Sequence, residues 1–216
     1  TVGIMKALLT MDQFVLLFRR GGRVAVRKVQ QKLNRDYGDY VGIVPTDGVY
    51  GREMNKALIQ VLQAIEGFTP AEATGNFGAG TRSRLKVITA SNARSHPTWV
   101  WFASVTLTCN GYPASVSSEW SEATEHLEKF QREYALPVSG KVDRTTWMSL
   151  LTSKGDPDRP CVACDTRFEI TDEFLAKLKS DGYKIVGRYL TEPGQDQKKP
   201  EDYFKAIRPG ELERIV

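Results

Sequence analysis

Apolar side chains recur in the first part of the chain at the spacing of amphipathic helices. Val26, Val29 and Leu33 lie three and four positions apart, which places them on one face of a helix together with Gln30. Two later stretches share another pattern, in which apolar residues three positions apart precede a glutamine: Ile59, Leu62 and Gln63, then Leu127, Phe130 and Gln131. We expect the side-chain amides of these glutamines to cap neighbouring loops.

One motif occurs three times with the same spacing. A glycine is followed at the second position by an apolar residue, then at four-residue intervals by threonine or methionine and by leucine: Gly48, Tyr50, Met54 and Leu58; Gly75, Phe77, Thr81 and Leu85; Gly140, Val142, Thr146 and Leu150. Glycine adopts turn conformations that other residues resist, and residues four apart share a helix face. Each copy predicts a turn that enters a helix, and in the last copy Asp143 is the candidate N-cap.

These patterns predict a mainly α fold with two tandem three-helix units. The first unit spans residues 23–90 and the second spans residues 97–152, with a polar linker at residues 91–97. Residues 1–22 echo a later helix of the first unit, so we interpret them as an N-terminal helix, the tail of an upstream repeat.

The composition changes after residue 152, where a linker rich in glycine and proline begins. Residues 161–216 then predict a strand that ends at Asp165, a helix with Thr171 as N-cap, and a second strand at residues 184–190. A strand–helix–strand unit of this kind builds parallel sheets. A further helix is expected at residues 200–207, because Pro200 suits a first helical turn.

The helix at residues 26–34 (VRKVQQKLN) and the turn at residues 47–51 (DGVYG) resemble the start of the peptidoglycan-binding family of three-helix modules. Residues 136–143 (LPVSGKVD), followed by Thr146 and Trp147, resemble its typical ending. The resemblance implies peptidoglycan as partner and a secreted or cell-wall-associated location in a bacterium. Residues 117–120 (SSEW) replace the DGxYG turn in the second unit, so we expect wall binding mostly through the first.

Asp47, Tyr50 and Tyr40 are the candidate ligand-binding residues, because they lie in or near the first turn. Aromatic faces stack on sugars, and carboxylates accept hydrogen bonds from hydroxyl groups. The competing interpretation is that Tyr50, with Gly48 and Gly51, only makes the turn. Trp147 and Phe130 are expected in the core.

Residues 163–165 (ACD) and 187–190 (GRYL) resemble the first two strand ends of a glycoside-hydrolase-like (β/α)8 barrel family. A whole barrel takes about 250 residues, so residues 161–216 would be the N-terminal part of a truncated barrel. The resemblance implies Asp165 as a catalytic carboxylate, with Arg188 and Tyr189 beside it. Glu192 follows the second strand, and we interpret it as a solvated loop residue.

The charge and the cysteine content disfavour several further classes of protein. The net charge of +4 is spread over 216 residues, whereas nucleic-acid binding favours a concentrated basic stripe. Nucleic acid is therefore not expected as a partner. The apolar residues 4–18 are interrupted by polar ones and are too few to span a membrane. Cys161 and Cys164 form a single CxxC motif, which we interpret as small residues entering a strand, with a redox pair as the alternative. No metal or cofactor is expected, since no glycine-rich nucleotide motif follows a strand.

Three functions remain open at this point. The first is a glycoside hydrolase that the helical units target to the cell wall, and the second is a wall-anchoring protein with an inert barrel. The third is another wall enzyme, such as an amidase. A zinc amidase is disfavoured, because the two histidines are isolated from each other and from other metal ligands.

Overall fold

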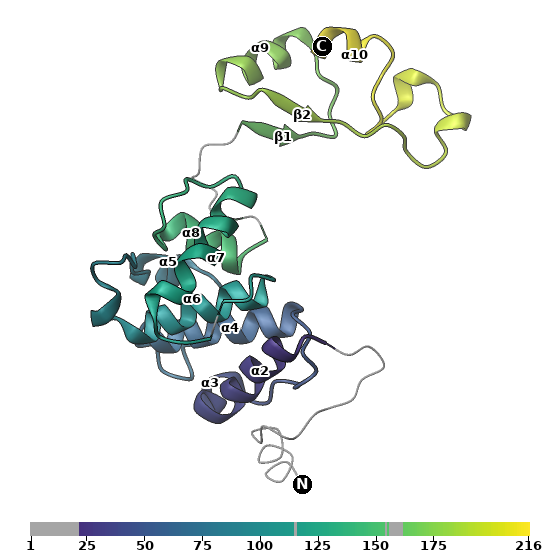
Figure 1. Cartoon of the computed structure of the whole chain (residues 1–216). Coiled ribbons are helices and arrows are strands. Elements are labelled where there is room, and N and C mark those ends of the chain that lie inside the picture. Colours follow the sequence, from purple (N-terminus) through teal and green to yellow (C-terminus); the bar gives the residue numbers. More distant parts are fainter. Residues whose placement is uncertain (1–21, 115, 154, 156–161) are drawn as a thin grey trace. The chain divides into compact units, whose positions relative to one another are not determined.

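The chain forms two compact units, Thr1–Pro157 and Asp158–Val216. The computed structural model describes residues 22–114, 116–153, 155 and 162–216 (Figure 1). The fold is mainly α, as the sequence predicts. The helix expected within residues 1–22 lies almost wholly outside the described residues, as does Cys161.

The first unit is built from helices separated by short turns. In chain order they are α2 (Val24–Asp36), α3 (Gly38–Val41), α4 (Arg52–Ile65), α5 (Ala79–Arg84), the 3-10 turn η1 (Ala93–Ser95), α6 (Pro97–Cys109), α7 (Trp120–Glu133) and α8 (Arg144–Leu151). The helices predicted through residues 26–33 and 127–131 are thereby confirmed as parts of α2 and α7. Asp143 accepts a hydrogen bond from the backbone of Thr146 at 2.8 Å, which confirms the predicted N-cap of α8.

Helix α6 is the centre of this unit. It contacts α2, α4, α7 and α8, and nearly all of its side chains are buried. A helix that is apolar all round must be enclosed by other elements, which explains why α6 lacks the polar face of its neighbours. Trp147, predicted as core, is fully buried against Phe102 and Trp99, with ring centroids 5.7 Å away in both pairs. Phe130 is fully buried as well.

The two predicted helical units share a single hydrophobic core. Leu33 and Leu58 from the first belong to the same buried cluster as Leu127 and Leu150 from the second. The segment before α6 is joined to the α7–α8 turn by backbone hydrogen bonds of 3.0 and 2.9 Å between Ile88 and Val142. The two halves therefore meet through buried apolar side chains and not only through a linker.

The second unit is a small parallel strand pair with a helix between the strands. Strand β1 (Ala163–Asp165) pairs with β2 (Ile185–Gly187), and Asp165 lies opposite Gly187. Helix α9 (Asp172–Ser180) connects them, and Thr171 caps it by accepting a bond from the Phe174 backbone, as expected. The remaining elements are short: η2 (Gln195–Gln197), η3 (Pro200–Asp202) and α10 (Glu211–Ile215).

The helix expected at residues 200–207 is wrong beyond its first turn. Only η3 is helical, and the backbone N–H groups of residues 204–206 donate to the carboxylate of Glu192 instead of to helical carbonyls. Strand β2 is also shorter than predicted, although Tyr189 forms one further parallel bridge with Ala206. A tertiary contact with Glu192 thus overrides the local helix signal that Pro200 provides.

Candidate functional site

Three glutamine–glycine pairs hold the turns of the repeated motif. The side-chain oxygen of Gln30 accepts the N–H of Gly48 at 2.7 Å, and its amide nitrogen donates to the carbonyl of Val49 at 3.2 Å. The same two bonds recur from Gln63 to Gly75 and Asn76, and from Gln131 to Gly140 and Lys141. All three glutamines are buried, so the prediction that their amides cap loops is confirmed.

The first of these turns leads directly into the candidate site. Gly48 has φ of +74°, and a Cβ there would lie 2.6 Å from the carbonyl oxygen of Arg23, so the position requires glycine. Asp47 accepts hydrogen bonds from Gln30 at 2.8 Å and from the Val49 backbone at 2.9 Å. The Asp47 carboxylate therefore helps to shape the turn.

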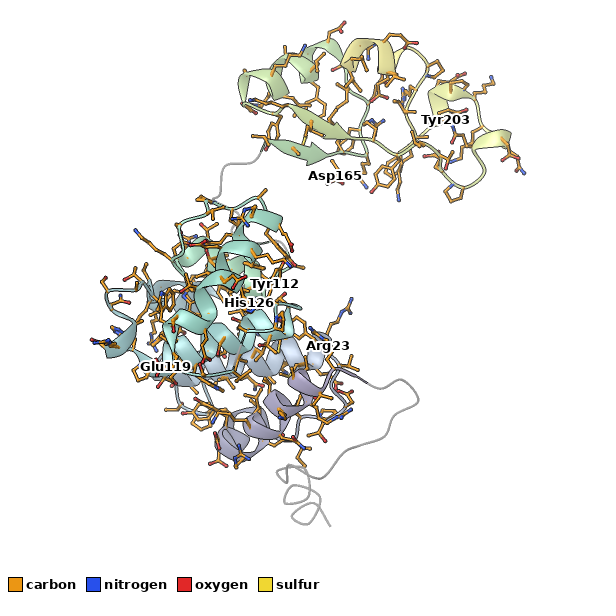
Figure 2. All side chains as sticks on the ribbon, viewed as in Figure 1. Arg23, Tyr112, Glu119, His126, Asp165 and Tyr203 are labelled. Atoms are coloured by element: carbon orange, nitrogen blue, oxygen red, sulfur yellow. The ribbon has the colours of Figure 1, made fainter. Side chains whose placement is uncertain are left out.

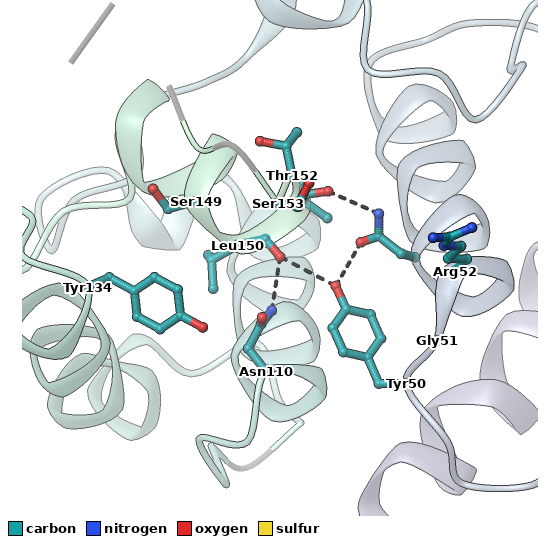
Figure 3. A pocket seen from close by; sticks show the side chains of 11 residues that line it. Tyr50, Gly51, Arg52, Asn110, Tyr134, Ser149, Leu150, Thr152 and Ser153 are labelled. Carbon is teal, nitrogen blue, oxygen red and sulfur yellow. Dashed lines mark hydrogen bonds between the residues drawn. The ribbon is translucent and has the colours of Figure 1, made fainter. Parts of the chain in front are cut away.

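A groove of about 520 Å³ lies beside this turn, between the two halves of the first unit. It is lined by residues 50–52 and Asn55 from the first half, and by Asn110, Tyr134 and residues 149–153 from the second (Figure 3). Its volume falls within the range of roughly 300–1,000 Å³ that is common for small-ligand sites.

The floor of the groove is the C-terminal end of α8. The carbonyl of Leu150 accepts from Asn110 at 2.9 Å, and the carbonyl of Leu151 accepts from Asn55 at 3.0 Å (Figure 3). The last carbonyls of a helix have no partner within it, so these amides satisfy groups that would otherwise be orphaned. Two asparagines that lie far apart in the sequence thus fix the end of α8 and shape the groove.

Tyr50 contributes its ring to the groove and its hydroxyl to the same network. The hydroxyl donates to Asn55 at 2.7 Å and lies 3.5 Å from the Leu150 carbonyl. Burial raises the pKa of Tyr50 to about 12, so the phenol is neutral at physiological pH. Tyr50 therefore lines the groove, and its hydroxyl is already bonded within the protein, so ligand contact by Tyr50 stays a prediction.

Two further side chains of the groove differ in their exposure. Ser149 is only 7% exposed, yet its hydroxyl finds no hydrogen-bond partner among the described residues. Arg52 is exposed at the first turn of α4 and is the one charged residue among the described residues that line the groove. Sequence reasoning missed Asn55, Asn110 and Ser149, because nothing in the local pattern distinguishes them from other polar helix residues.

The structure does not bring the three predicted ligand-binding residues into one site. Asp47 lines a neighbouring hollow of about 270 Å³, which shares Gly51 and Arg52 with the larger groove. Tyr40 lines neither, and its hydroxyl donates to the carbonyl of Phe68 at 3.1 Å. Asp47 and Tyr50 therefore line two adjoining hollows before α4, whereas Tyr40 lines neither.

In the second unit, Asp165 and Arg188 lie at the same edge of the strand pair. Asp165 ends β1 and is exposed (Figure 2), and Arg188 directly follows β2. All five N–H donors of Arg188 already have acceptors: both Glu211 oxygens and the carbonyls of Thr166, Lys205 and Ala206. Arg188 thus stabilises the unit, and its guanidinium has no donor left for a sugar. Tyr189 is 45% exposed beside it.

The interpretation of Glu192 as a solvated loop residue is wrong. Its side chain is buried and accepts hydrogen bonds from Lys198 at 2.8 Å and from the backbone of Phe204, Lys205 and Ala206. The bond from Lys198, followed by those from the backbone, lowers the pKa of Glu192 to about 2. Glu192 is a structural anchor for the segment that the sequence assigned to a helix.

Cys109 and Cys164 are free cysteines, and the Cys161–Cys164 pair is not tested because Cys161 lies outside the described residues. Burial raises the pKa of Cys109 to about 12, which keeps its thiol protonated. No cluster of metal-ligating side chains occurs among residues 22–114, 116–153, 155 and 162–216. Over the same residues, no helix combines the length and apolar character that crossing a membrane requires.

The comparisons with known proteins agree with the helical unit. The first unit is a peptidoglycan-binding-like domain: a family described as "FadG/YbfG, PGDB-like domain" matches residues 19–151. The chain therefore belongs to the FadG/YbfG family of such domains. No solved structure gives a significant match.

Two curated relatives come from Bacillus subtilis (strain 168), and both are described as uncharacterized. The chain is 43% identical to YbfG over 195 residues, which cover 88% of this chain and 26% of YbfG. It is 39% identical to FadG over 220 residues, which cover 100% of this chain and 37% of FadG. The chain thus spans between a quarter and two fifths of the length of these relatives.

Proposed function

We propose that the first unit binds peptidoglycan and holds the second unit at the bacterial cell wall. The observation that carries this proposal is the groove beside the first turn, in a domain whose family is peptidoglycan-binding-like. Its lining combines the aromatic rings of Tyr50 and Tyr134 with amides and hydroxyls, the mixture that recognises a sugar-rich polymer. The net charge of +4 favours association with an anionic wall.

For the second unit, the proposal is the start of a glycoside-hydrolase-like domain. The parallel pair β1–β2 with α9 between the strands supports it, because this unit builds α/β barrels. Ile185 and Leu190 support it as well, since they are 63% and 77% exposed and would be covered by further elements. A location outside the cell follows from the same proposal.

The alternative, wall anchoring without catalysis, is favoured by the carboxylates of the second unit. Glycoside hydrolysis usually needs two carboxylates at one site. Asp165 is exposed, whereas Glu192 and Glu211 are engaged in hydrogen bonds that hold the backbone and Arg188. This chain by itself is therefore proposed to bind the wall and not to cleave it.

The test is sedimentation of the whole chain with purified insoluble peptidoglycan. We expect the wild type to sediment with the wall and Arg52→Ala to bind about three- to tenfold more weakly, the effect of one lost charged hydrogen bond. Arg132→Ala is the matched control, because Arg132 is an exposed arginine on α7 that does not line the groove. A wild-type chain that stays in the supernatant would contradict wall binding. Equal loss in both variants would assign the effect to general charge.

A further inference from the structure

We infer that the groove between the two halves takes the glycan backbone of peptidoglycan rather than its stem peptide. This inference rests on the proposed function, because it names the part of the polymer that the same site recognises. It follows from four features of the groove: its charge, its aromatic ends, an unpartnered hydroxyl and its origin from both halves.

The charge of the groove fits a neutral ligand. Among the described residues, Arg52 is the one charged side chain that lines the groove, and no described carboxylate lines it. A stem peptide carries several carboxylates and commonly an amine, so its site would present charges of both signs. A strand of N-acetylated sugars presents hydroxyls and acetamides, which hydrogen-bond to neutral amides and hydroxyls.

Aromatic rings lie on opposite sides of the groove. Figure 3 shows Tyr134 on one side and Tyr50 on the other, with Leu150 and Asn110 between them. Tyr134 is 43% exposed and is held in place by Phe130, with ring centroids 4.3 Å apart. A pyranose ring packs its apolar C–H face on such a surface, and two separated rings suit consecutive sugars better than one compact ligand.

Ser149 supplies a polar group that lacks a partner. Ser149 lines the groove, and its hydroxyl is buried beneath the surface and makes no hydrogen bond to any described residue. Buried hydroxyls without a partner are uncommon in proteins. A hydroxyl or acetamide of a bound sugar would complete the hydrogen bonding of Ser149 once the side chains around it move aside.

The site exists only because the halves are packed together. Arg52 and Asn55 belong to α4, whereas Asn110, Tyr134 and Ser149 follow or belong to α6, α7 and α8. This differs from the expectation that the first helical unit binds the wall mostly alone. The composite groove is a property of the pair, and neither half contains all of it.

The experiment measures binding of the whole chain to two soluble probes by calorimetry. One probe is the tetramer of β-1,4-linked N-acetylglucosamine, and the other is a synthetic stem tetrapeptide that contains D-amino acids. Sedimentation with insoluble peptidoglycan is measured in parallel. We expect the tetramer to bind and the peptide not to bind.

The variant Ser149→Ala separates binding from folding. It removes a hydroxyl without a partner, so its melting temperature should equal or exceed that of the wild type, while affinity for the tetramer falls about three- to tenfold. Ser83→Ala is the matched control, since Ser83 is an exposed helical serine outside the groove. Unchanged affinity in Ser149→Ala would overturn its assigned role.

The outcomes separate this inference from the proposed function. Sedimentation with the wall together with binding of the tetramer supports both. Sedimentation with binding of the peptide alone, or of neither probe, overturns the glycan inference and leaves wall binding standing. Absence of sedimentation overturns the proposed function itself.

Discussion

Ile88 and Val142 join the two halves of the first unit through a pair of backbone hydrogen bonds of 3.0 and 2.9 Å. Both side chains are fully buried in the common core. The bridge lies where the end of the first predicted repeat meets the last turn of the second. It makes the stability of each half depend on the other.

The first prediction follows from this bridge. Val142→Ala should destabilise the whole first unit by about 2 kcal/mol, the order expected for removing two buried methyl groups and leaving a cavity. Amide hydrogen exchange should accelerate equally at Leu58 in α4 and Leu127 in α7, because both lie in one core. Acceleration confined to α7 and α8 would show that the halves unfold independently.

The second prediction concerns the glutamine–glycine pairs. Gln63→Ala should cost about 2–3 kcal/mol in the free energy of unfolding, because it leaves the Gly75 N–H and the Asn76 carbonyl unpaired. Gln60→Ala on the same helix removes a single bond to Ala73 and should cost about 1 kcal/mol or less. Urea denaturation followed by tryptophan fluorescence measures both, since all four tryptophans lie in the first unit. Equal losses of unfolding free energy in Gln63→Ala and Gln60→Ala would show that Gln63 has no special role in the turn.

The third prediction concerns Glu66, whose two carboxylate oxygens are buried without a hydrogen-bond partner among the described residues. Burial raises its pKa to about 8, although Arg84 partly opposes the shift. Folding therefore favours the protonated acid, and its contribution to stability is complete below pH 4.5, the pKa for the unfolded chain. That contribution falls as pH rises from 4.5 to about 8.

Glu66→Gln should remove this pH dependence and raise the thermal midpoint of the first unit at pH 8 relative to the wild type. Fluorescence melting curves at pH 5 and pH 8 give the comparison. Glu125→Gln, which changes an exposed glutamate of α7, provides the control. A midpoint difference between Glu66→Gln and the wild type that is the same at both pH values would contradict the assignment.

The fourth prediction concerns Glu192 in the second unit, where the pKa shift and the pH dependence of stability are opposite in sign to those of Glu66. The pKa of Glu192 is lowered to about 2, first by Lys198 and then by the backbone of Lys205, so its ionised form stabilises the folded state. This stability is present above pH 4.5 and is lost as pH falls toward 2. The Lys205 amide should lose its protection against hydrogen exchange, followed by NMR, as the pH falls from 4.5 toward 2. In Glu192→Gln the amide should already exchange quickly at neutral pH, whereas persistent protection would refute the anchoring role.

The fifth prediction is that this chain releases no sugar from peptidoglycan. In the described part of the second unit, Asp165 is exposed at the end of β1, whereas the carboxylates of Glu192 and Glu211 hold other groups. Incubation with insoluble peptidoglycan, followed by a reducing-sugar assay with lysozyme as positive control, tests it. Release that disappears in Asp165→Asn would instead make Asp165 catalytic in this chain.

The sequence alone determined the helices of the first unit and the turns between them. Helical periodicity, glycine at positive φ and the cap at Asp143 act within a few residues, so the local pattern predicts them correctly. The positions of the glutamines on their helices also predicted that their side-chain amides cap neighbouring loops, whereas their burial came from the tertiary structure.

Only the tertiary structure decided where distant residues meet. The shared core and the groove with Asn110 and Ser149 depend on contacts between segments that are far apart in the sequence. The burial of Glu192 depends on a loop that folds back onto it from 6 to 14 residues further on. The helix expected after Pro200 shows the reason. The backbone N–H groups of Phe204 and Lys205 can bond either to helical carbonyls or to the Glu192 carboxylate. They bond to Glu192, because the packing of the unit brings its carboxylate within reach.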